Sequence, residues 1–228
     1  MQVLLVHGFG GEDGGRMEQA LGECAATSGH SLRPFRWRSG NLTSMMTGSL
    51  IDIFTDALSD ANPLRVSARV LLAIQQNARV HWENALVHIT EANLALLGII
   101  RQLVRGREDF SIIAFSLGAR VTLLTLQKMR DGTPSLRRVV FAGAAVPRSA
   151  FGLIPDAVRT PHGDRVINVY SDDDYVLSGI YPFVHGCRDC AGAKPVEEKG
   201  VKNVRVGSSH LSYSQFAHLL FDYAIGKK

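Results

Sequence analysis

One serine stands where an apolar run meets a helical pattern. Residues 109–120 read DFSIIAFSLGAR, so the apolar run ends at Phe115 and Ser116 follows at once. A nucleophilic serine needs this arrangement, because a tight strand-to-helix turn exposes its hydroxyl at a helix N-terminus. The crowded turn also needs small residues two positions to either side, and here they are Ala114 and Gly118, which makes the motif A-x-S-x-G rather than G-x-S-x-G. The alternative for so short a motif is a buried serine that caps a helix.

Candidates for an acid and a base follow Ser116 in the chain order serine, acid, histidine that such hydrolases use. Asp172, Asp173 and Asp174 come directly after the apolar run 165–171, and His210 comes after a second run at 204–206. Adjacent aspartates in a loop are often a solvated surface, and a lone histidine is often an ordinary surface residue. Because all of these residues occur in the right order and after predicted strands, the pattern favours a Ser-His-Asp triad.

The chain opens with MQVLLVHGFGG, an apolar run followed by a His-Gly turn. In acyl hydrolases such a turn aims a backbone N–H at the oxyanion, and we expect the N–H of Phe9 and that of Leu117 to do so. A dinucleotide site is the alternative, but the spacing Gly8-x-Gly10-x-x-x-Gly14 is one residue too long and residues 36–38 offer no acid for a ribose. A phosphate-binding loop of the Walker type lacks its Gly-Lys-Ser/Thr.

The elements that must position these residues alternate between short β-rich runs and helical patterns, which predicts an α/β fold with a mostly parallel sheet flanked by helices. The predicted strands are Val3–Val6, Ser31–Trp37, Phe110–Phe115, Arg138–Ala142, Val166–Tyr170 and Val204–Val206. The predicted helices between them are Arg16–Ser28, Gly118–Arg130 and Ser212–Ala224.

Residues 41–107 interrupt this alternation with two helical patterns, at about 44–59 and 64–105, separated by Asn62-Pro63. The segment either packs on one face of the sheet or forms a cap over the site, and the two interpretations are about equally supported. Its first pattern is more apolar than one helix face needs. In the cap interpretation, four of its residues line an apolar substrate pocket: Met45, Met46, Leu50 and Phe54.

Length and composition are those of a globular protein of one domain, 1–228, with 46% hydrophobic and 20% charged residues. A net charge of +4 without a Lys/Arg block argues against nucleic acid as a partner, although it allows peripheral contact with a membrane. Three cysteines cannot all pair, and Cys187 with Cys190 fits an incidental loop pair better than a zinc or redox site. No signal-peptide or transmembrane pattern is evident, so a cytoplasmic location is expected.

Several segments resemble one family of hydrolases. They are residues 115–121 (FSLGARV), 139–147 (VVFAGAAVP), 165–171 with 174–177 (RVINVYS and DYVL), 200–204 with 210–213 (GVKNV and HLSY), and the helical stretch 81–96. Together they are similar to the DUF726 (TMCO4-like) α/β hydrolases. The resemblance implies a lipase-like or esterase-like fold. It also selects Asp174 among the three aspartates, because the acid of the family stands directly before an aromatic residue and Val-Leu.

The sequence therefore predicts an α/β-hydrolase fold with a helical insertion at 41–107. It predicts a serine esterase or lipase-type enzyme that acts on a small-molecule or lipid ester, with Ser116 as nucleophile, His210 as base and Asp174 as acid. The mechanism requires no metal and no organic cofactor. The competing hypothesis is a catalytically idle hydrolase fold that binds a membrane or a protein partner. The oligomeric state and the acyl and alcohol groups of the substrate are left open.

Overall fold

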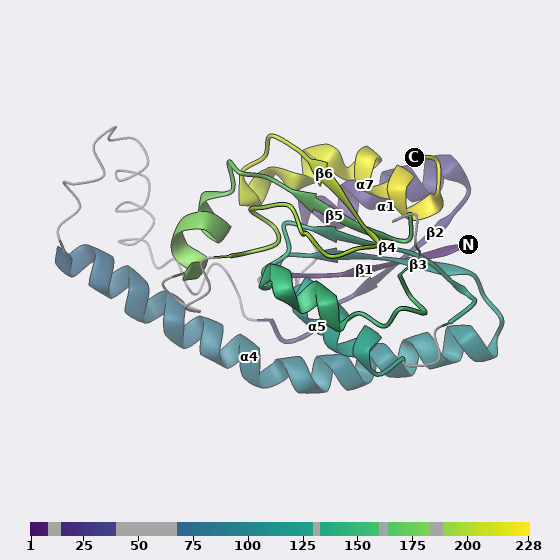
Figure 1. The fold of residues 1–228 in the computed structure, drawn as a ribbon, viewed down its shortest axis with the longest axis horizontal. Coiled ribbons are helices and arrows are strands. Elements are labelled where there is room, and N and C mark those ends of the chain that lie inside the picture. Colours follow the sequence, from purple (N-terminus) through teal and green to yellow (C-terminus); the bar gives the residue numbers. More distant parts are fainter. Residues whose placement is uncertain (9–14, 40–67, 130–132, 160–163, 183–188) are drawn as a thin grey trace.

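A sheet of parallel strands forms the centre of the computed structural model, which describes residues 1–8, 15–39, 68–129, 133–159, 164–182 and 189–228 (Figure 1). The six strands of the described residues lie in the order β2-β1-β3-β4-β5-β6, and each neighbouring pair is parallel. Their bounds are β1 Gln2–Val6, β2 Ser31–Phe35, β3 Phe110–Phe115, β4 Leu136–Ala142, β5 Val166–Tyr170 and β6 Val201–Arg205. All carboxyl ends therefore lie at one edge of the sheet.

Helices cover both faces of the sheet, which is why the inner strands are apolar at nearly every position rather than at every second one. Helices α1 (Arg16–Ser28) and α7 (Ala217–Ile225) lie on one face, where they pack with Val3 and Leu5 of β1. Helices α4 (Ala68–Arg105) and α5 (Gly118–Gln127) lie on the other face with Leu4 and Val6. Figure 1 shows this division, with α1 and α7 above the sheet and α4 below it.

Three short helical segments complete the described structure at the edge where the strands end. They are η2 (Arg148–Leu153), η3 (Val176–Ile180) and η4 (His210–Phe216). Each follows a strand after a few residues, so the loops that leave β4, β5 and β6 all turn back over this edge. The sheet order, together with a strand-to-helix turn at Ser116 in its middle, is the architecture of an α/β-hydrolase fold.

Most predicted elements form, with differences at their ends. Helix α1 has the predicted bounds, because Gly29 ends it in the left-handed conformation at φ +70°. Strand β6 begins three residues earlier than predicted. It is the outermost strand, last in the sheet order, and it is half exposed, so its apolar pattern is weak. The C-terminal helical pattern begins as the 3₁₀ segment η4 and becomes α-helical only from Ala217.

The second helical pattern of the insertion is a single helix, α4, of 38 residues. At 1.5 Å per residue such a helix is about 57 Å long. Figure 1 shows it running along one face of the sheet and continuing past the edge where the strands end. The first pattern, with Met45, Met46, Leu50 and Phe54, lies outside the described residues. The second pattern thus packs on one face of the sheet, and a cap formed by the first pattern stays a prediction.

Candidate active site

Ser116 occupies a strained turn between β3 and α5. Its φ is +52°, and among the described residues only one other non-glycine residue, Arg107, has a positive φ. A side chain in this region costs about 1–3 kcal/mol, so the surrounding contacts must hold it there. The Ser116 N–H donates to the carbonyl of Ala142 at 3.0 Å, and its carbonyl accepts from the N–H groups of Ala119 and Ala145, each at 3.1 Å. The turn is thus tied to β4 and to the loop that follows β4.

Two glycines allow the turn to pack against the end of β1. A Cβ atom at Gly118 would lie 2.3 Å from the carbonyl oxygen of Val6 and 2.6 Å from that of His7. A Cβ atom at Gly8 would lie 2.6 Å from the Cβ of Ser116. At both positions the space is too small for any side chain, which accounts for the glycine two positions after the serine. Two positions before the serine, β3 holds the fully buried Ala114, so the packing there accommodates a methyl group.

The three predicted triad residues come together at this edge of the sheet. The Oγ of Ser116 lies 2.8 Å from Nε2 of His210, and Nδ1 of His210 lies 2.7 Å from Oδ2 of Asp174. The other carboxylate oxygen of Asp174 accepts the N–H of Leu177 at 3.0 Å. Asp174 has no exposed surface, and Ser116 and His210 are 4% and 8% exposed. A hydroxyl, an imidazole and a buried carboxylate in this order can pass a proton from the hydroxyl to the imidazole.

The other two aspartates point elsewhere. Asp172 is exposed and forms a bidentate ion pair with Arg205, with N–O distances of 2.7 and 2.6 Å. The hydrogen bonds from Arg205 lower the pKa of the Asp172 carboxyl. Asp173 is exposed and donates its backbone N–H to the hydroxyl of Ser171. Of the three aspartates, only Asp174 contacts His210.

Aromatic side chains hold the imidazole of His210. The ring of Phe115 stacks on it at 5.3 Å and 25°, and the ring of Tyr213 meets it edge-on at 6.3 Å and 72°. Tyr213 is fully buried, and burial raises the pKa of its phenol, so the hydroxyl stays neutral. The sequence pattern assigned no role to these two rings, since both are ordinary core residue types.

Ser171 joins the loop that carries the acid to the loop that carries the histidine. Its hydroxyl oxygen accepts the backbone N–H of Asp173 at 3.2 Å and that of Ser208 at 3.0 Å. The side chain is fully buried, so water cannot replace these bonds. Sequence reasoning missed this residue. The only available signal was its place at the end of β5, three residues before Asp174.

The two predicted oxyanion donors have different outcomes. Leu117 is fully buried directly before α5, where the helix dipole favours negative charge. Within the described ranges, its backbone N–H has no acceptor in a turn, loop or cap. Phe9 lies outside the described residues.

Of the two cysteines predicted to be an incidental loop pair, Cys187 also lies outside the described residues. The thiol of Cys190 is buried and donates to the carbonyl of Ala144 at 3.0 Å. The part of the chain that the structure describes contains no cluster of three metal-ligating side chains.

Comparison with known proteins places this chain in a family. The family model described as "Protein of unknown function (DUF726)" matches residues 61–225, which include Ser116, Asp174 and His210. The chain belongs to the DUF726 family. The match confirms the family resemblance that the sequence motifs indicated, and it covers the segment from the insertion to the last helix.

Curated relatives of this DUF726 chain are longer proteins. Transmembrane and coiled-coil domain-containing protein STS1 of Oryza sativa subsp. japonica is 30% identical over 67% of this chain and 24% of its own length. An uncharacterized membrane protein of Caenorhabditis elegans is 27% identical over 59% of this chain and 23% of its own length. An uncharacterized membrane protein of Schizosaccharomyces pombe is 32% identical over 58% of this chain and 24% of its own length. The chain thus spans about a quarter of the length of these relatives.

One solved structure also resembles this DUF726 chain. It is a protein from Xanthomonas campestris pv. campestris that is assigned to the alpha/beta superfamily of hydrolases. The TM-score is 0.48 with 13% identity, over 100% of this chain and 99% of the other. Among the described residues of this chain, no helix has the length and apolar character needed to cross a membrane.

Proposed function

We propose that this chain is a serine hydrolase that cleaves carboxylic esters through an acyl-enzyme intermediate. The observation that carries the proposal is the hydrogen-bonded series Ser116–His210–Asp174, assembled from the ends of three different strands. A series of this length with a strained serine at one end and a buried carboxylate at the other has no evident value for stability. Its arrangement matches the needs of nucleophilic catalysis.

In the first half of the reaction, the Oγ of Ser116 attacks the carbonyl carbon of the ester while Nε2 of His210 takes the hydroxyl proton. Asp174 accepts the Nδ1–H of His210, which keeps Nε2 free as the acceptor and stabilises the imidazolium that forms. The tetrahedral oxyanion is stabilised by the backbone N–H of Leu117, with that of Phe9 as the predicted second donor. His210 then protonates the leaving alkoxide, and the acyl group remains on Ser116.

In the second half, water attacks the acyl carbon and gives its proton to Nε2 of His210. The tetrahedral intermediate collapses, the acid product leaves, and the proton returns to Ser116 Oγ. No metal or organic cofactor takes part in these steps.

Two exposed apolar side chains, each next to a triad residue in the sequence, favour an apolar, lipid-like ester as substrate, and we call them the exposed rim. Tyr175 directly follows Asp174 and is 72% exposed, and Leu211 directly follows His210 and is 68% exposed. Large apolar side chains in such positions are suited to contact with an acyl chain or a lipid surface. The pocket predicted from Met45, Met46, Leu50 and Phe54 remains a part of the same proposal. The low cysteine content fits a reducing compartment, so the proposed location is the cytoplasm.

Labelling with a fluorophosphonate tests the proposal against a binding module that has lost catalysis. The purified chain is expected to gain the mass of one phosphonyl group on Ser116 and to hydrolyse p-nitrophenyl esters from acetate to palmitate. Ser116→Ala should abolish both, because Ala fits the turn and only the nucleophile is lost. Ser28→Ala, which removes a hydroxyl at the far end of α1, should change neither. An unlabelled wild-type protein, or a Ser116→Ala variant that keeps more than a few per cent of activity, would refute the proposal.

A further inference from the structure

The end of β1 is held by a chain of charged and polar contacts that the triad does not use. His7 directly follows β1 and is 4% exposed. Its ring Nε2 lies 2.9 Å from Oε2 of Glu18, in the first turn of α1. Arg36, which follows β2, donates to the same carboxylate from Nη2 at 2.7 Å and from Nε at 3.2 Å. We call Arg36, Glu18 and His7 the anchoring network.

Charge in the anchoring network is fixed by its surroundings. The hydrogen bond from Arg36 lowers the pKa of the Glu18 carboxyl, so this group is ionised at neutral pH. Burial lowers the pKa of the His7 imidazole despite the opposing effect of Glu18, so the ring is neutral. A carboxylate can only accept, and therefore the proton of His7 lies on Nε2. The network has one arrangement of protons, and it locks the orientation of the ring.

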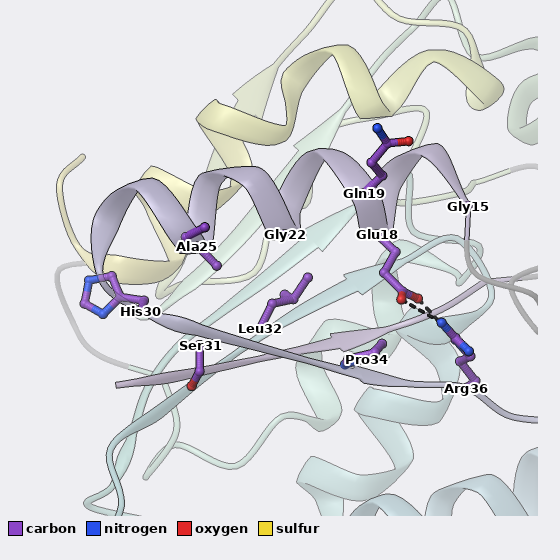
Figure 2. Close-up of a pocket in the computed structure, with 11 residues that line it drawn as sticks. Gly15, Glu18, Gln19, Gly22, Ala25, His30, Ser31, Leu32, Pro34 and Arg36 are labelled. Carbon is purple, nitrogen blue, oxygen red and sulfur yellow. Dashed lines mark hydrogen bonds and ion pairs between the residues drawn. The ribbon is translucent and has the colours of Figure 1, made fainter.

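Exposure falls along the network from the surface toward the serine. The side chains of Arg36, Glu18 and His7 are 46%, 20% and 5% exposed. Figure 2 shows Glu18 reaching from α1 toward Arg36 beside β2, where both line an open hollow of about 840 Å³. The outer end of the network can thus be altered without creating a void in the core.

The inner end of the network touches the nucleophile turn. The backbone N–H of His7 donates to the carbonyl of Phe35 at 3.3 Å, and its carbonyl accepts the Nε1–H of Trp37 at 2.7 Å. The carbonyl of His7 faces Gly118. Gly8, which follows His7 in the chain, packs against Ser116. Neither glycine has space for a Cβ atom. A shift of His7 by a few tenths of an ångström must therefore move the turn that holds Ser116.

We propose that Arg36, Glu18 and His7 are positioning residues, which fix the end of β1 against Ser116 and so set the serine for attack. The inference rests on the proposed function. Apolar residues can often replace a partly buried ionic network with no loss of stability, so what this network adds is a fixed geometry. Displacement of a reacting group by about 1 Å can cost about 100-fold in rate, so a partial displacement has a measurable effect.

Glu18→Gln is the sharpest test, because the amide keeps the shape of the side chain but has one acceptor oxygen where the carboxylate has two. The carboxylate accepts Nη2 of Arg36 on one oxygen and both Nε2 of His7 and Nε of Arg36 on the other, so in the variant an NH₂ group takes the place of one of these acceptors and faces a donor. The matched control is Glu23→Gln on the same helix, where the exposed carboxylate contacts only the Gln19 side chain in the described structure. We measure kcat and KM on p-nitrophenyl butyrate per folded molecule, and the inhibition constant of phenylboronic acid, whose adduct with Ser116 mimics the tetrahedral intermediate.

Glu18→Gln is expected to lower kcat about tenfold, to leave KM within about twofold, and to weaken the boronic acid by the same factor as kcat. Arg36→Gln, at the exposed end, provides a variant that should fold if Glu18→Gln does not, and should show a smaller loss of the same kind. The double variant should be no slower than Glu18→Gln alone, since in this proposal Arg36 acts on His7 through Glu18.

Equal kcat values for Glu18→Gln and Glu23→Gln would overturn the inference, as would a rise in KM with no change in the boronic acid constant. Both results would leave the proposed function in place, because the wild-type enzyme would still hydrolyse the ester. A wild-type protein that neither hydrolyses esters nor binds the boronic acid would instead refute the proposed function, and the inference would fall with it.

Discussion

Replacing Asp174 by asparagine tests the proton path of the candidate site most directly. The carboxylate accepts the N–H of Leu177 on one oxygen at 3.0 Å and faces Nδ1 of His210 with the other at 2.7 Å. If the amide oxygen of the variant keeps the bond to Leu177, its NH₂ group faces Nδ1. The imidazole must then carry its proton on Nε2, which faces the hydroxyl of Ser116 at 2.8 Å and can no longer accept a proton from it.

The opposite rotamer of the asparagine amide would also be unfavourable. It would set the NH₂ group against the N–H of Leu177, and two donors facing each other in a site with no exposed surface cost about 1–3 kcal/mol. We therefore expect kcat to fall by about 10⁴-fold, as in serine proteases with the same change. That factor corresponds to about 5 kcal/mol of transition-state stabilisation. Because the substitution leaves the substrate contacts in place, KM should change little.

The assay is p-nitrophenyl ester hydrolysis by wild type and by Asp172→Asn, Asp173→Asn and Asp174→Asn, with folding checked by thermal unfolding. Asp172→Asn loses only an exposed pair with Arg205, and Asp173→Asn changes an exposed side chain, so both should stay within about twofold of wild type. A loss at Asp172 equal to that at Asp174, or an Asp174→Asn variant with more than a few per cent of activity, would refute the assignment of the acid.

Two further outcomes follow from the same geometry. Ser171→Ala removes the buried hydroxyl that accepts two backbone N–H groups. Thermal unfolding should show a fold less stable by about 1–3 kcal/mol, and ester hydrolysis should show a kcat about tenfold lower. An unchanged kcat would show that the loops carrying Asp174 and His210 keep their positions without this hydroxyl. Tyr175→Ser combined with Leu211→Ser should raise KM for p-nitrophenyl palmitate and leave KM for the acetate unchanged, whereas equal effects on both esters would exclude the exposed rim as the acyl contact.

Local patterns in the sequence were sufficient for the sheet and for the candidate nucleophile. Strands buried on both faces are apolar throughout, and a serine placed directly between such a strand and a helix is typical of a nucleophile turn. The bounds of α1 were predicted because a helix-ending glycine is a local signal. The bounds of β6 were not, since an edge strand with one exposed face has little apolar pattern to detect.

Only the tertiary structure could decide which polar residues meet. Ser116 and His210 are 94 residues apart, and Asp174 and His210 are 36 apart, so their contacts depend on the order of the strands in the sheet. Sequence reasoning could set Asp174 apart from its neighbours only through a family resemblance. The structure does so physically, because it buries Asp174 against His210 and pairs Asp172 with Arg205.

The sequence did not assign a positioning role to Ser171 or to the anchoring network, although Ser171 stands directly after a predicted strand and His7 belongs to the His-Gly turn. A serine, a glutamate or an arginine is common on any protein surface, and its type does not say whether a partner lies beside it. Glu18 and Arg36 acquire a role only because α1 and β2 bring them together next to His7. Element type and order follow from local apolar patterns, whereas the positioning contacts arise from burial and close approach between distant segments, which exist only once the chain has folded.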